Sequence, residues 1–371
     1  MKYSELYGFA AQCLTPDLIP EFRERAFALL KEETQAEAFV YLCSNHFVLP
    51  VVWQNLKDYD LQHVFTPELQ EHLDYIQKLN QKRNLEILDQ VVELCETLHH
   101  YHIEPVFLKG TANLLDGIYG NAGERMIGDI DMLVQEKDYL LTASLVQELG
   151  YRYDEKVYDE VGVLKHFPRL YKPDVPADIE IHRIPVTEIY SRHFSTSLIF
   201  SRKKAVTGLE NCFVPCDDHK AVLNFIHDQL GNYGYWLKRT SLRYLYDSYR
   251  IGRRLDYQQL LDKQVYSRKM NNYFVVQHRL ALQPVSQGLQ VTAGSERYYR
   301  LHNWFLDHEK VFRFFFILTR IYQVFFKWGL FRMHRLFIPR YFKGIIKRLK
   351  DPEWYKNRVW GNLKNWYLKY F

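Results

Sequence analysis

The stretch FLKGTANLLDGIYGNAGERMIGDIDMLV, residues 107–134, contains two short apolar runs separated by a glycine-containing loop. The first run leads into Gly110, which predicts a buried strand that ends in a tight turn. We expect a helix over 112–119 with Thr111 as its N-cap, because threonine side chains accept hydrogen bonds from the first free amides of a helix. The second run predicts a strand with Asp129 and Asp131 on one face, because side chains alternate along a strand.

Two carboxylates on one face of a buried strand repel each other unless a cation lies between them. Magnesium prefers oxygen ligands of this kind, together with phosphate oxygens. The later segment ADIEIH places Asp178, Glu180 and His182 on one face of another predicted strand. If the two strands are neighbours, Asp129, Asp131 and Glu180 can hold two metal ions, which stabilise the attacking and leaving oxygens of phosphoryl or nucleotidyl transfer.

Several polar residues near the acids leave alternatives open. Asp178 lies on the face of Glu180 and could replace it as the third ligand. His182 is expected to orient a metal ligand, because oxygen suits magnesium better than nitrogen does. His166 and Arg169 lie on a further predicted strand, where contact with a nucleotide and ordinary surface charge are both compatible with the sequence, and surface charge is the simpler interpretation.

Two basic residues of the opening stretch have both functional and structural interpretations. Lys109 comes just before the predicted glycine turn, which suits a phosphate contact, although a solvated lysine is common at a strand end. Arg125 lies in the loop before the Asp129 strand. Its guanidinium could clamp a triphosphate oxygen, or it could pair with an acid such as Glu124 or Asp129 and shape the loop.

The order of these residues resembles a bacterial nucleotidyltransferase family that has a DNA polymerase beta-type palm. The pattern is Lys-Gly, then Arg-x-x-x-Asp-x-Asp-x-x-Val, then an acid-x-His strand. The matching positions are Lys109, Gly110, Arg125, Asp129, Asp131, Val134, Glu180 and His182. A later element, His227 followed by LRYLYD at 242–247, also fits the family. The resemblance covers roughly residues 80–250.

The resemblance implies a metal-dependent transfer of a nucleoside monophosphate from a nucleoside triphosphate such as ATP to a hydroxyl, with release of pyrophosphate. Asp129, Asp131 and Glu180 would be catalytic and would ligate two Mg²⁺ ions, with Mn²⁺ as a substitute. The residues that would bind the nucleotide are Lys109, Gly110, Thr111, Arg125 and His182. The acceptor is expected to be a small molecule, a peptide or protein, or a glycan precursor, in preference to RNA.

Two departures from the family pattern support an alternative function. Thr111 stands where the superfamily usually has serine or glycine, and Glu180 stands where aspartate is more usual. A non-catalytic nucleotide-binding or membrane-associated scaffold with a degenerate palm is therefore the alternative. A phosphotransferase that uses the same metal ions is a third possibility. Among later residues, His227, Lys238, Arg239 and Asp247 are candidate base or phosphate contacts.

The expected fold class is α+β, with a small mixed-sheet palm flanked by helical segments. In the N-terminal part, apolar residues at three- and four-residue spacing predict helices over 18–33, 35–45, 48–56 and 67–101. The expected organisation is an N-terminal helical region (1–102), a nucleotidyltransferase palm (103–205), a helical domain (206–309) and a basic aromatic tail (310–371).

The charge of the chain is concentrated in its tail. Residues 310–371 contain fifteen Lys and Arg but two acids, a net charge of +13, so the rest carries −8 of the total of +5. This asymmetry suggests a membrane surface or another anionic partner, contacted by an amphipathic helix; a terminal helix packed on the helical domain is the simpler alternative. Scattered cysteines and the lack of an apolar signal-peptide core predict a cytoplasmic protein, with peripheral membrane contact as an option.

Overall fold

The computed structural model describes residues 2–19, 21–153, 165–280 and 289–322, with seven further residues between 337 and 352. Its contacts divide the chain into two compact units. The first contains residues 1–153 and 165–309, and the second contains 154–164 and 310–371. The sheet and the helices up to α15 belong to the first unit. Apart from Glu309, the last described helix, α16 (Glu309–Tyr322), belongs to the second.

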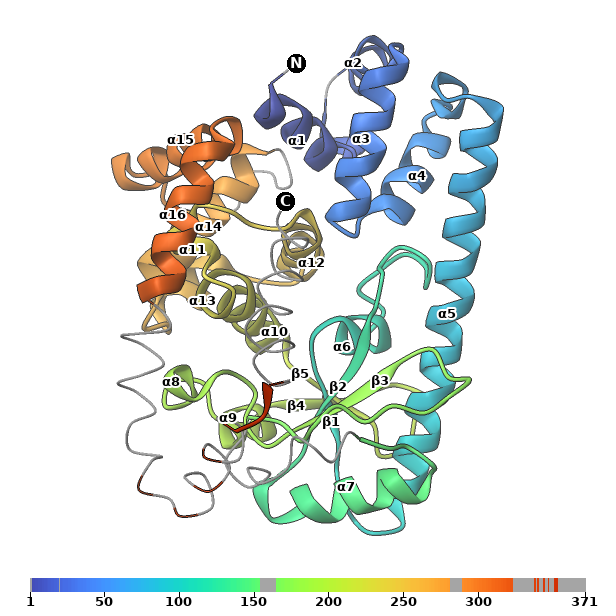
Figure 1. The fold of residues 1–371 in the computed structure, drawn as a ribbon, viewed down its shortest axis with the longest axis vertical. Helices are drawn as coiled ribbons and strands as arrows, with labels where there is room; N and C mark the ends of the chain where they lie inside the picture. Colours follow the sequence, from blue (N-terminus) through green and yellow to red (C-terminus); the bar gives the residue numbers. More distant parts are fainter. Residues whose placement is uncertain are drawn as a thin grey trace. The chain divides into compact units, whose positions relative to one another are not determined.

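The N-terminal region is helical, as its apolar spacing predicts. Its elements are α1 (Tyr3–Gln12), η1 (Pro16–Leu18), α2 (Phe22–Leu30), α3 (Glu33–Asn45), α4 (Leu49–Asp58), η2 (Gln62–Val64) and α5 (Pro67–His99). The sequence Thr66-Pro67 starts α5 as expected, because the Thr66 hydroxyl accepts from the Leu69 amide at 3.4 Å. Figure 1 shows α5 running from the N-terminal helices past the edge of the sheet.

A five-stranded mixed sheet follows, which confirms the predicted α+β class. Its elements are β1 (Val106–Phe107), α6 (Lys109–Leu115), β2 (Asp129–Leu133), η3 (Glu136–Asp138), α7 (Tyr139–Glu148), β3 (Asp178–His182), α8 (Glu188–Ser191), α9 (Thr196–Ser201), β4 (Lys203–Ala205) and β5 (Phe213–Pro215). The strand order is β3-β2-β1-β5-β4, with β2 parallel to β3 and β1 parallel to β5. The other two pairings are antiparallel. Figure 1 shows α6 and α7 on opposite sides of this sheet.

The sheet extends beyond the predicted palm range of 103–205. Strand β5 lies at 213–215 and pairs with β1 in the interior of the sheet. Three residues are too few to show an alternating pattern, so the sequence alone does not reveal this strand. Arg152 pairs with Tyr171, and residues 154–164 lie outside the described residues.

The part of the first unit after the sheet is helical. It contains α10 (Asp217–Phe225), a π-helical turn η5 (Ile226–Gly231), α11 (Gly234–Leu237), α12 (Leu242–Gly252), α13 (Tyr257–Asp262), α14 (Ser267–Arg279) and α15 (Ala293–Asp307). Helices α11 and α12 do not form one continuous helix, because Lys238 adopts a left-handed backbone conformation with φ of 53°. Gly234 is required at this break, since a Cβ there would lie 2.4 Å from the Arg239 carbonyl oxygen.

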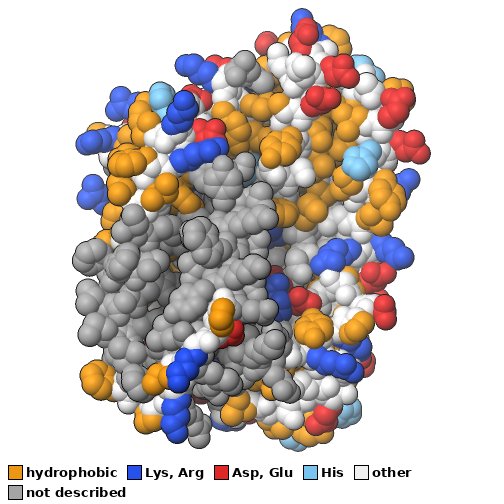
Figure 2. Space-filling model, in the orientation of Figure 1, with side chains coloured by type: hydrophobic (Ala, Val, Ile, Leu, Met, Phe, Trp, Pro, Cys, Tyr) orange, Lys and Arg blue, Asp and Glu red, His pale blue; other side chains and the backbone are white. Residues whose placement is uncertain are grey.

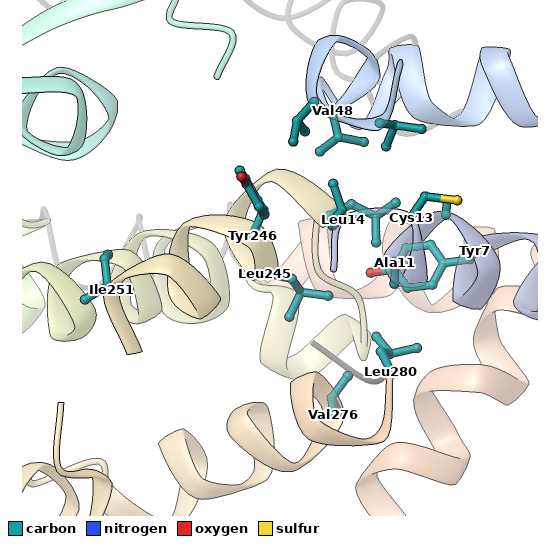
Figure 3. Packing of buried hydrophobic residues seen from close by; sticks show 14 of the residues in the cluster. Tyr7, Ala11, Cys13, Leu14, Val48, Leu245, Tyr246, Ile251, Val276 and Leu280 are labelled. Atoms are coloured by element: carbon teal, nitrogen blue, oxygen red, sulfur yellow. The ribbon is translucent and has the colours of Figure 1, made fainter. Parts of the chain in front are cut away.

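One hydrophobic core joins the N-terminal helices to the later helices. Figure 3 shows Tyr7 and Ala11 of α1 in the same packed cluster as Leu245 of α12 and Val276 of α14, and all four are buried. Burial of each large apolar side chain stabilises the fold by roughly 1.5–3 kcal/mol. The helices that precede the palm in the sequence and those that follow it therefore stabilise one another through this shared core.

The surface combines charged residues with several exposed aromatic rings. Figure 2 shows hydrophobic side chains gathered over the N-terminal helices on the displayed face. Phe27, Tyr41 and Tyr75 are among the exposed aromatic residues of the N-terminal region. No helix among the described residues has the length and apolar character needed to cross a bilayer. In α16, Phe312 and Phe316 are buried, while Phe314 is exposed. Residues 323–336 of the basic aromatic tail lie outside the described residues.

Candidate active site

The parallel pairing of β2 and β3 brings the predicted acids together. In register, Asp129 lies opposite Asp178 and Asp131 lies opposite Glu180. Paired residues of neighbouring strands project on the same side of a sheet. The prediction that the Glu180 strand lies beside the Asp129/Asp131 strand is therefore confirmed, and four carboxylates from two distant segments share one face.

Asp131 is the centre of this group. It is 2% exposed, and its Oδ1 accepts from the Lys109 ammonium at 2.5 Å. The same oxygen lies 2.8 Å from Nε2 of the fully buried His182, whose Nε2 is also 3.6 Å from Glu180 Oε2. Burial opposes the ionisation of Asp131, but Lys109 and His182 outweigh it and hold the pKa of Asp131 below its ordinary value.

Neighbouring acids of the site differ in how readily they ionise. Burial, and next the charge of Asp131, raise the pKa of Asp129 above its usual value. Burial acts in the same direction on Glu180, but hydrogen bonding with His182 and the positive charges around it lower the pKa of Glu180. The pKa values of neighbouring carboxylates diverge in this way when positively charged groups stabilise the ionised form of one carboxylate more than that of the other.

Lys109 reaches Asp131 from a strained backbone position. Its φ is 54°, a left-handed conformation that non-glycine residues rarely adopt. Strain of this kind persists where the surrounding structure enforces it, often at functional sites. Helix α6 starts at Lys109, so Thr111 is inside the helix, and the expectation that Thr111 is an N-cap is wrong. Its hydroxyl is buried and donates to the Asp129 carbonyl oxygen at 3.2 Å, which ties α6 to β2.

Arg125 is a buried structural arginine, and neither of the acids suggested by the sequence is its partner. Its Nε and Nη2 donate to the two carboxylate oxygens of Asp247 in α12, at 3.0 and 2.9 Å. Its Nη1 donates to the Met126 carbonyl oxygen. A Cβ on Gly110 would lie 3.5 Å from this guanidinium, so Gly110 packs closely against it. These bonds tie the loop before β2 to α12, and the triphosphate clamp by Arg125 stays a prediction.

Two asparagines of α5 hold the same loop, and sequence reasoning missed both. The Asn80 amide donates to the Gly123 carbonyl oxygen at 2.7 Å, and the Asn84 amide donates to the Arg125 carbonyl oxygen at 2.7 Å. Both side chains are buried. Two asparagines at four-residue spacing inside an apolar helix stripe were the available signal, because buried amides require hydrogen-bond partners.

A β-bulge beside β3 places additional residues on the acid face. His166 pairs with His182, and Leu170 pairs with Ile179, so three residues oppose two between these pairs. In a regular strand, residues 166 and 169 would face opposite sides. The extra residue re-aims one of them. The ring of His166 lies 5.1 Å from that of His182, and the guanidinium of Arg169 also reaches the acids.

Arg169 binds the acidic cluster directly. Its Nη2 lies 2.7 Å from Glu180 Oε1 and 3.0 Å from Asp129 Oδ2, and its Nη1 lies 3.7 Å from Asp178 Oδ2. The interpretation of Arg169 as ordinary surface charge is therefore wrong. The sequence could not show this contact, because it depends on the bulge and on the register of β3.

With this geometry in place, comparison with known proteins gives one match. A family model described as an uncharacterised nucleotidyltransferase matches residues 32–275. The chain belongs to this nucleotidyltransferase family. The matched range runs from the residue before α3 into α14, so it is wider than the resemblance at 80–250 and includes helices on both sides of the palm. No curated protein and no solved structure matches the chain significantly.

Two more basic residues of this nucleotidyltransferase lie in the electrostatic field of the acids. Burial, and next the charge of Lys109, lower the pKa of Lys165 to about 8. Burial and Lys109 also lower the pKa of His227, which follows α10 in the π-helical turn. The Nδ1 atom of His227 has no hydrogen-bond partner among the described residues. His227 was a candidate from the sequence, whereas Lys165 was missed.

The donors present fit a divalent metal ion. Asp131, Glu180 and His182 each offer one ligand atom, and these atoms lie within 4.8 Å of one another. Asp129 adds a further carboxylate on the same face. Carboxylate oxygens suit magnesium and manganese, and Nε2 is the ring nitrogen of His182 that faces the carboxylates. The cluster is therefore suited to hold cations, and Lys109 and Arg169 are the cations that contact it here.

Proposed function

We propose that this nucleotidyltransferase moves a nucleoside monophosphate from a nucleoside triphosphate to an acceptor hydroxyl and releases pyrophosphate. The observation that carries the proposal is the register of β2 and β3, which places Glu180 directly beside Asp131 and close to Asp129. Membership of a nucleotidyltransferase family supplies the reaction class. Bound Mg²⁺ ions, or Mn²⁺ in their place, would supply charge neutralisation for the attacking and leaving oxygens.

The proposed roles follow from the contacts of each side chain. Asp129 and Asp131 would ligate both ions. Glu180 would ligate the ion nearer the acceptor, and its carboxylate would take the acceptor's proton. Lys109, the buried ammonium beside Asp131, would contact a phosphate oxygen. His182 would orient Asp131 through its 2.8 Å contact and so would act on the nucleotide indirectly.

Three residues expected to bind the nucleotide are better assigned to positioning. Gly110 and Thr111 are buried, and the hydroxyl of Thr111 is already bonded to the backbone of β2. Arg125 is bonded to Asp247 by two of its nitrogens. We therefore propose that these residues fix the start of α6 and the loop before β2, which sets where Lys109 and Asp129 lie.

The acceptor is proposed to carry a hydroxyl and to be a small molecule, a peptide or protein, or a glycan precursor. RNA is less favoured because the sequence contains no recognisable nucleic-acid module. The proposed location is the cytoplasm, and the +13 charge of residues 310–371 is the feature that would give peripheral contact with a membrane or another anionic partner. These classes of acceptor molecule are therefore the first to test as substrates.

Replacement of Asp131 by asparagine tests the function. The protein is incubated with labelled nucleotides, Mg²⁺ and a cell extract, and both pyrophosphate release and labelled products are measured. We expect Asp131→Asn to reduce transfer by about a thousand-fold or more, roughly 4 kcal/mol of lost transition-state stabilisation, because the remaining carboxylates cannot hold the ions equally well. Circular dichroism should show an unchanged fold.

The control is Asp89→Asn, which makes the same chemical change at an exposed position of α5. It should leave transfer unchanged. Transfer by Asp131→Asn at the rate of the unaltered protein would contradict the proposal. Release of a nucleoside diphosphate in place of pyrophosphate would instead indicate a phosphotransferase.

A further inference from the structure

We propose that Arg169 couples metal binding to nucleotide binding. Its guanidinium occupies the carboxylate oxygens that a metal ion needs, and a bound ion moves it from the acids to the triphosphate. This inference rests on the proposed function, because it concerns how the same site takes up its nucleotide and its ions. It assigns to Arg169 a positioning role on the acids and a binding role on the phosphates.

The contacts of Arg169 are with the proposed metal ligands. One nitrogen, Nη2, contacts both Glu180 Oε1 at 2.7 Å and Asp129 Oδ2 at 3.0 Å, so it bridges the two strands. A divalent ion bound by these carboxylates would lie within a few ångströms of the guanidinium. Like charges at that separation repel strongly in a partly buried site. Arg169 and the ion therefore compete for the same oxygens.

Arg169 can move when this competition occurs. Its side chain is 50% exposed, and among the described residues it pairs with the carboxylates of Asp129, Asp178 and Glu180. Arg125, by contrast, has a side chain that is 7% exposed and is bonded on three nitrogens. An exposed arginine on a β-bulge can change its side-chain conformation while β3 keeps its register.

Triphosphate is the ligand that the surrounding charges favour for the displaced guanidinium. Lys109 contacts Asp131, Arg169 contacts Asp129 and Glu180, and the charges of the same acids act on Lys165. The Thr111 hydroxyl at the predicted phosphate turn is buried and already bonded. Side-chain cations must then provide most of the phosphate contacts. The planar guanidinium fork matches phosphate oxygens well.

The test measures two affinities separately. Mn²⁺ affinity is measured without nucleotide, from the electron paramagnetic resonance signal of free Mn²⁺. Affinity for a fluorescent ATP analogue is measured at saturating Mn²⁺, the state in which the bound ion has moved Arg169 from the acids to the triphosphate. For Arg169→Gln we expect Mn²⁺ to bind about tenfold tighter and the analogue to bind about tenfold more weakly, within the range typical of coupled sites. Arg169→Lys should give smaller changes of the same signs, because it keeps the charge but loses the fork.

A matched control comes from Arg202, which is also half exposed and paired with one acid, Asp218, at 3.1 Å. Arg202→Gln should change neither affinity. An Arg169→Gln protein with unchanged or weaker Mn²⁺ binding would overturn the proposal, and so would unchanged binding of the analogue. A purely structural role for Arg169 would weaken both ligands together, so the opposite signs are the decisive result.

Failure of this inference can be distinguished from failure of the proposed function. If the unaltered protein releases pyrophosphate while Arg169→Gln leaves both affinities unchanged, the coupling is wrong and the transferase assignment remains. If the two affinities shift in opposite directions while no acceptor is ever modified, the coupling is supported and the transfer reaction is the part that fails.

Discussion

Two arginines bind carboxylates near the site, and they differ in burial. Arg125 is bound by Asp247, with side chains that are 7% and 3% exposed. Arg169 is bound by Asp129 and Glu180, and half of its side chain faces solvent. The first pair joins the loop before β2 to α12. The second joins β2 to β3 through a residue on a bulge.

The difference shows which contacts are fixed and which can be exchanged. A buried arginine-carboxylate pair has no water to replace a lost partner, so removing one member leaves an uncompensated charge. A half-exposed pair is weakened by solvent and contributes little to stability. The Arg125 pair therefore belongs to the framework of the fold, while the Arg169 contacts can be given up when ligands arrive.

Removal of Asp247 should have the largest effect on stability. Asp247→Ala leaves the Arg125 guanidinium buried without its carboxylate and also removes the acceptor of the Tyr119 hydroxyl, which lies 2.7 Å away. We expect a loss of about 3–5 kcal/mol in the free energy of unfolding, measured by urea denaturation followed by circular dichroism. Asp178→Ala is the control, because its 3.7 Å contact with Arg169 is exposed, and a loss below about 1 kcal/mol is expected. Equal losses of unfolding free energy in the two variants would show that burial does not determine how much each arginine-carboxylate pair contributes to stability.

The sequence indicated which acids share a strand face, but it did not indicate the partners of the two arginines. A period of two was enough to place Asp129 with Asp131, and Glu180 with His182, because alternation along a strand is a local property. The contact of Arg169 depends on one inserted residue in a bulge, and the partner of Arg125 is 122 residues away in α12. Neither feature leaves a periodic signal, so neither could be read from spacing.

The fold shows the same division between local and long-range information. Helix α5 was predicted from its apolar spacing over 67–101, and it spans Pro67–His99. Strand β5 has three residues, and its position beside β1 depends on pairing across a hundred residues. The start of α6 was misplaced because Lys109 adopts a left-handed conformation that its residue type does not suggest.

Replacement of Arg125 by lysine should have the next largest effect. Lysine keeps the charge, but one ammonium cannot reproduce the two bonds to Asp247 together with the bond to the Met126 carbonyl oxygen. We expect Arg125→Lys to lower the free energy of unfolding by about 2 kcal/mol, the range for lost hydrogen bonds to charged groups. Arg202→Lys, at a half-exposed pair, should change stability by less than about 0.5 kcal/mol. An unchanged Arg125→Lys protein would show that charge alone holds the loop.

Lys165 and Lys109 differ in how their charges depend on pH. Its lowered pKa of about 8 means that it is protonated below pH 8 and loses its charge as the pH rises through that value. Lys109 has a raised pKa, because the acids around it outweigh its burial, and it stays charged. If Lys165 contacts phosphate, affinity for the ATP analogue should fall by up to about tenfold between pH 7 and pH 9, equal to one charge-assisted contact.

The variant Lys165→Gln provides the control for this titration. It should bind the analogue more weakly at pH 7 and should show a much smaller decline toward pH 9, because the group that titrates is gone. Titration is followed by fluorescence in EDTA, so that metal hydrolysis does not contribute. A decline of the same size in Lys165→Gln would assign the pH dependence to another group.

Replacement of Thr111 tests whether its hydroxyl is structural or binds phosphate. It has the smallest expected effect on stability. Thr111→Val keeps the side-chain shape but removes the hydroxyl that donates to the Asp129 carbonyl oxygen at 3.2 Å. We expect a loss of about 1 kcal/mol in the free energy of unfolding, the usual contribution of one buried hydrogen bond. Affinity for the ATP analogue should stay within twofold, because a side chain that is 1% exposed does not meet the phosphates. A tenfold loss of that affinity without loss of stability would return Thr111 to the nucleotide site, and α6 would then have to open at its first turn when the triphosphate binds.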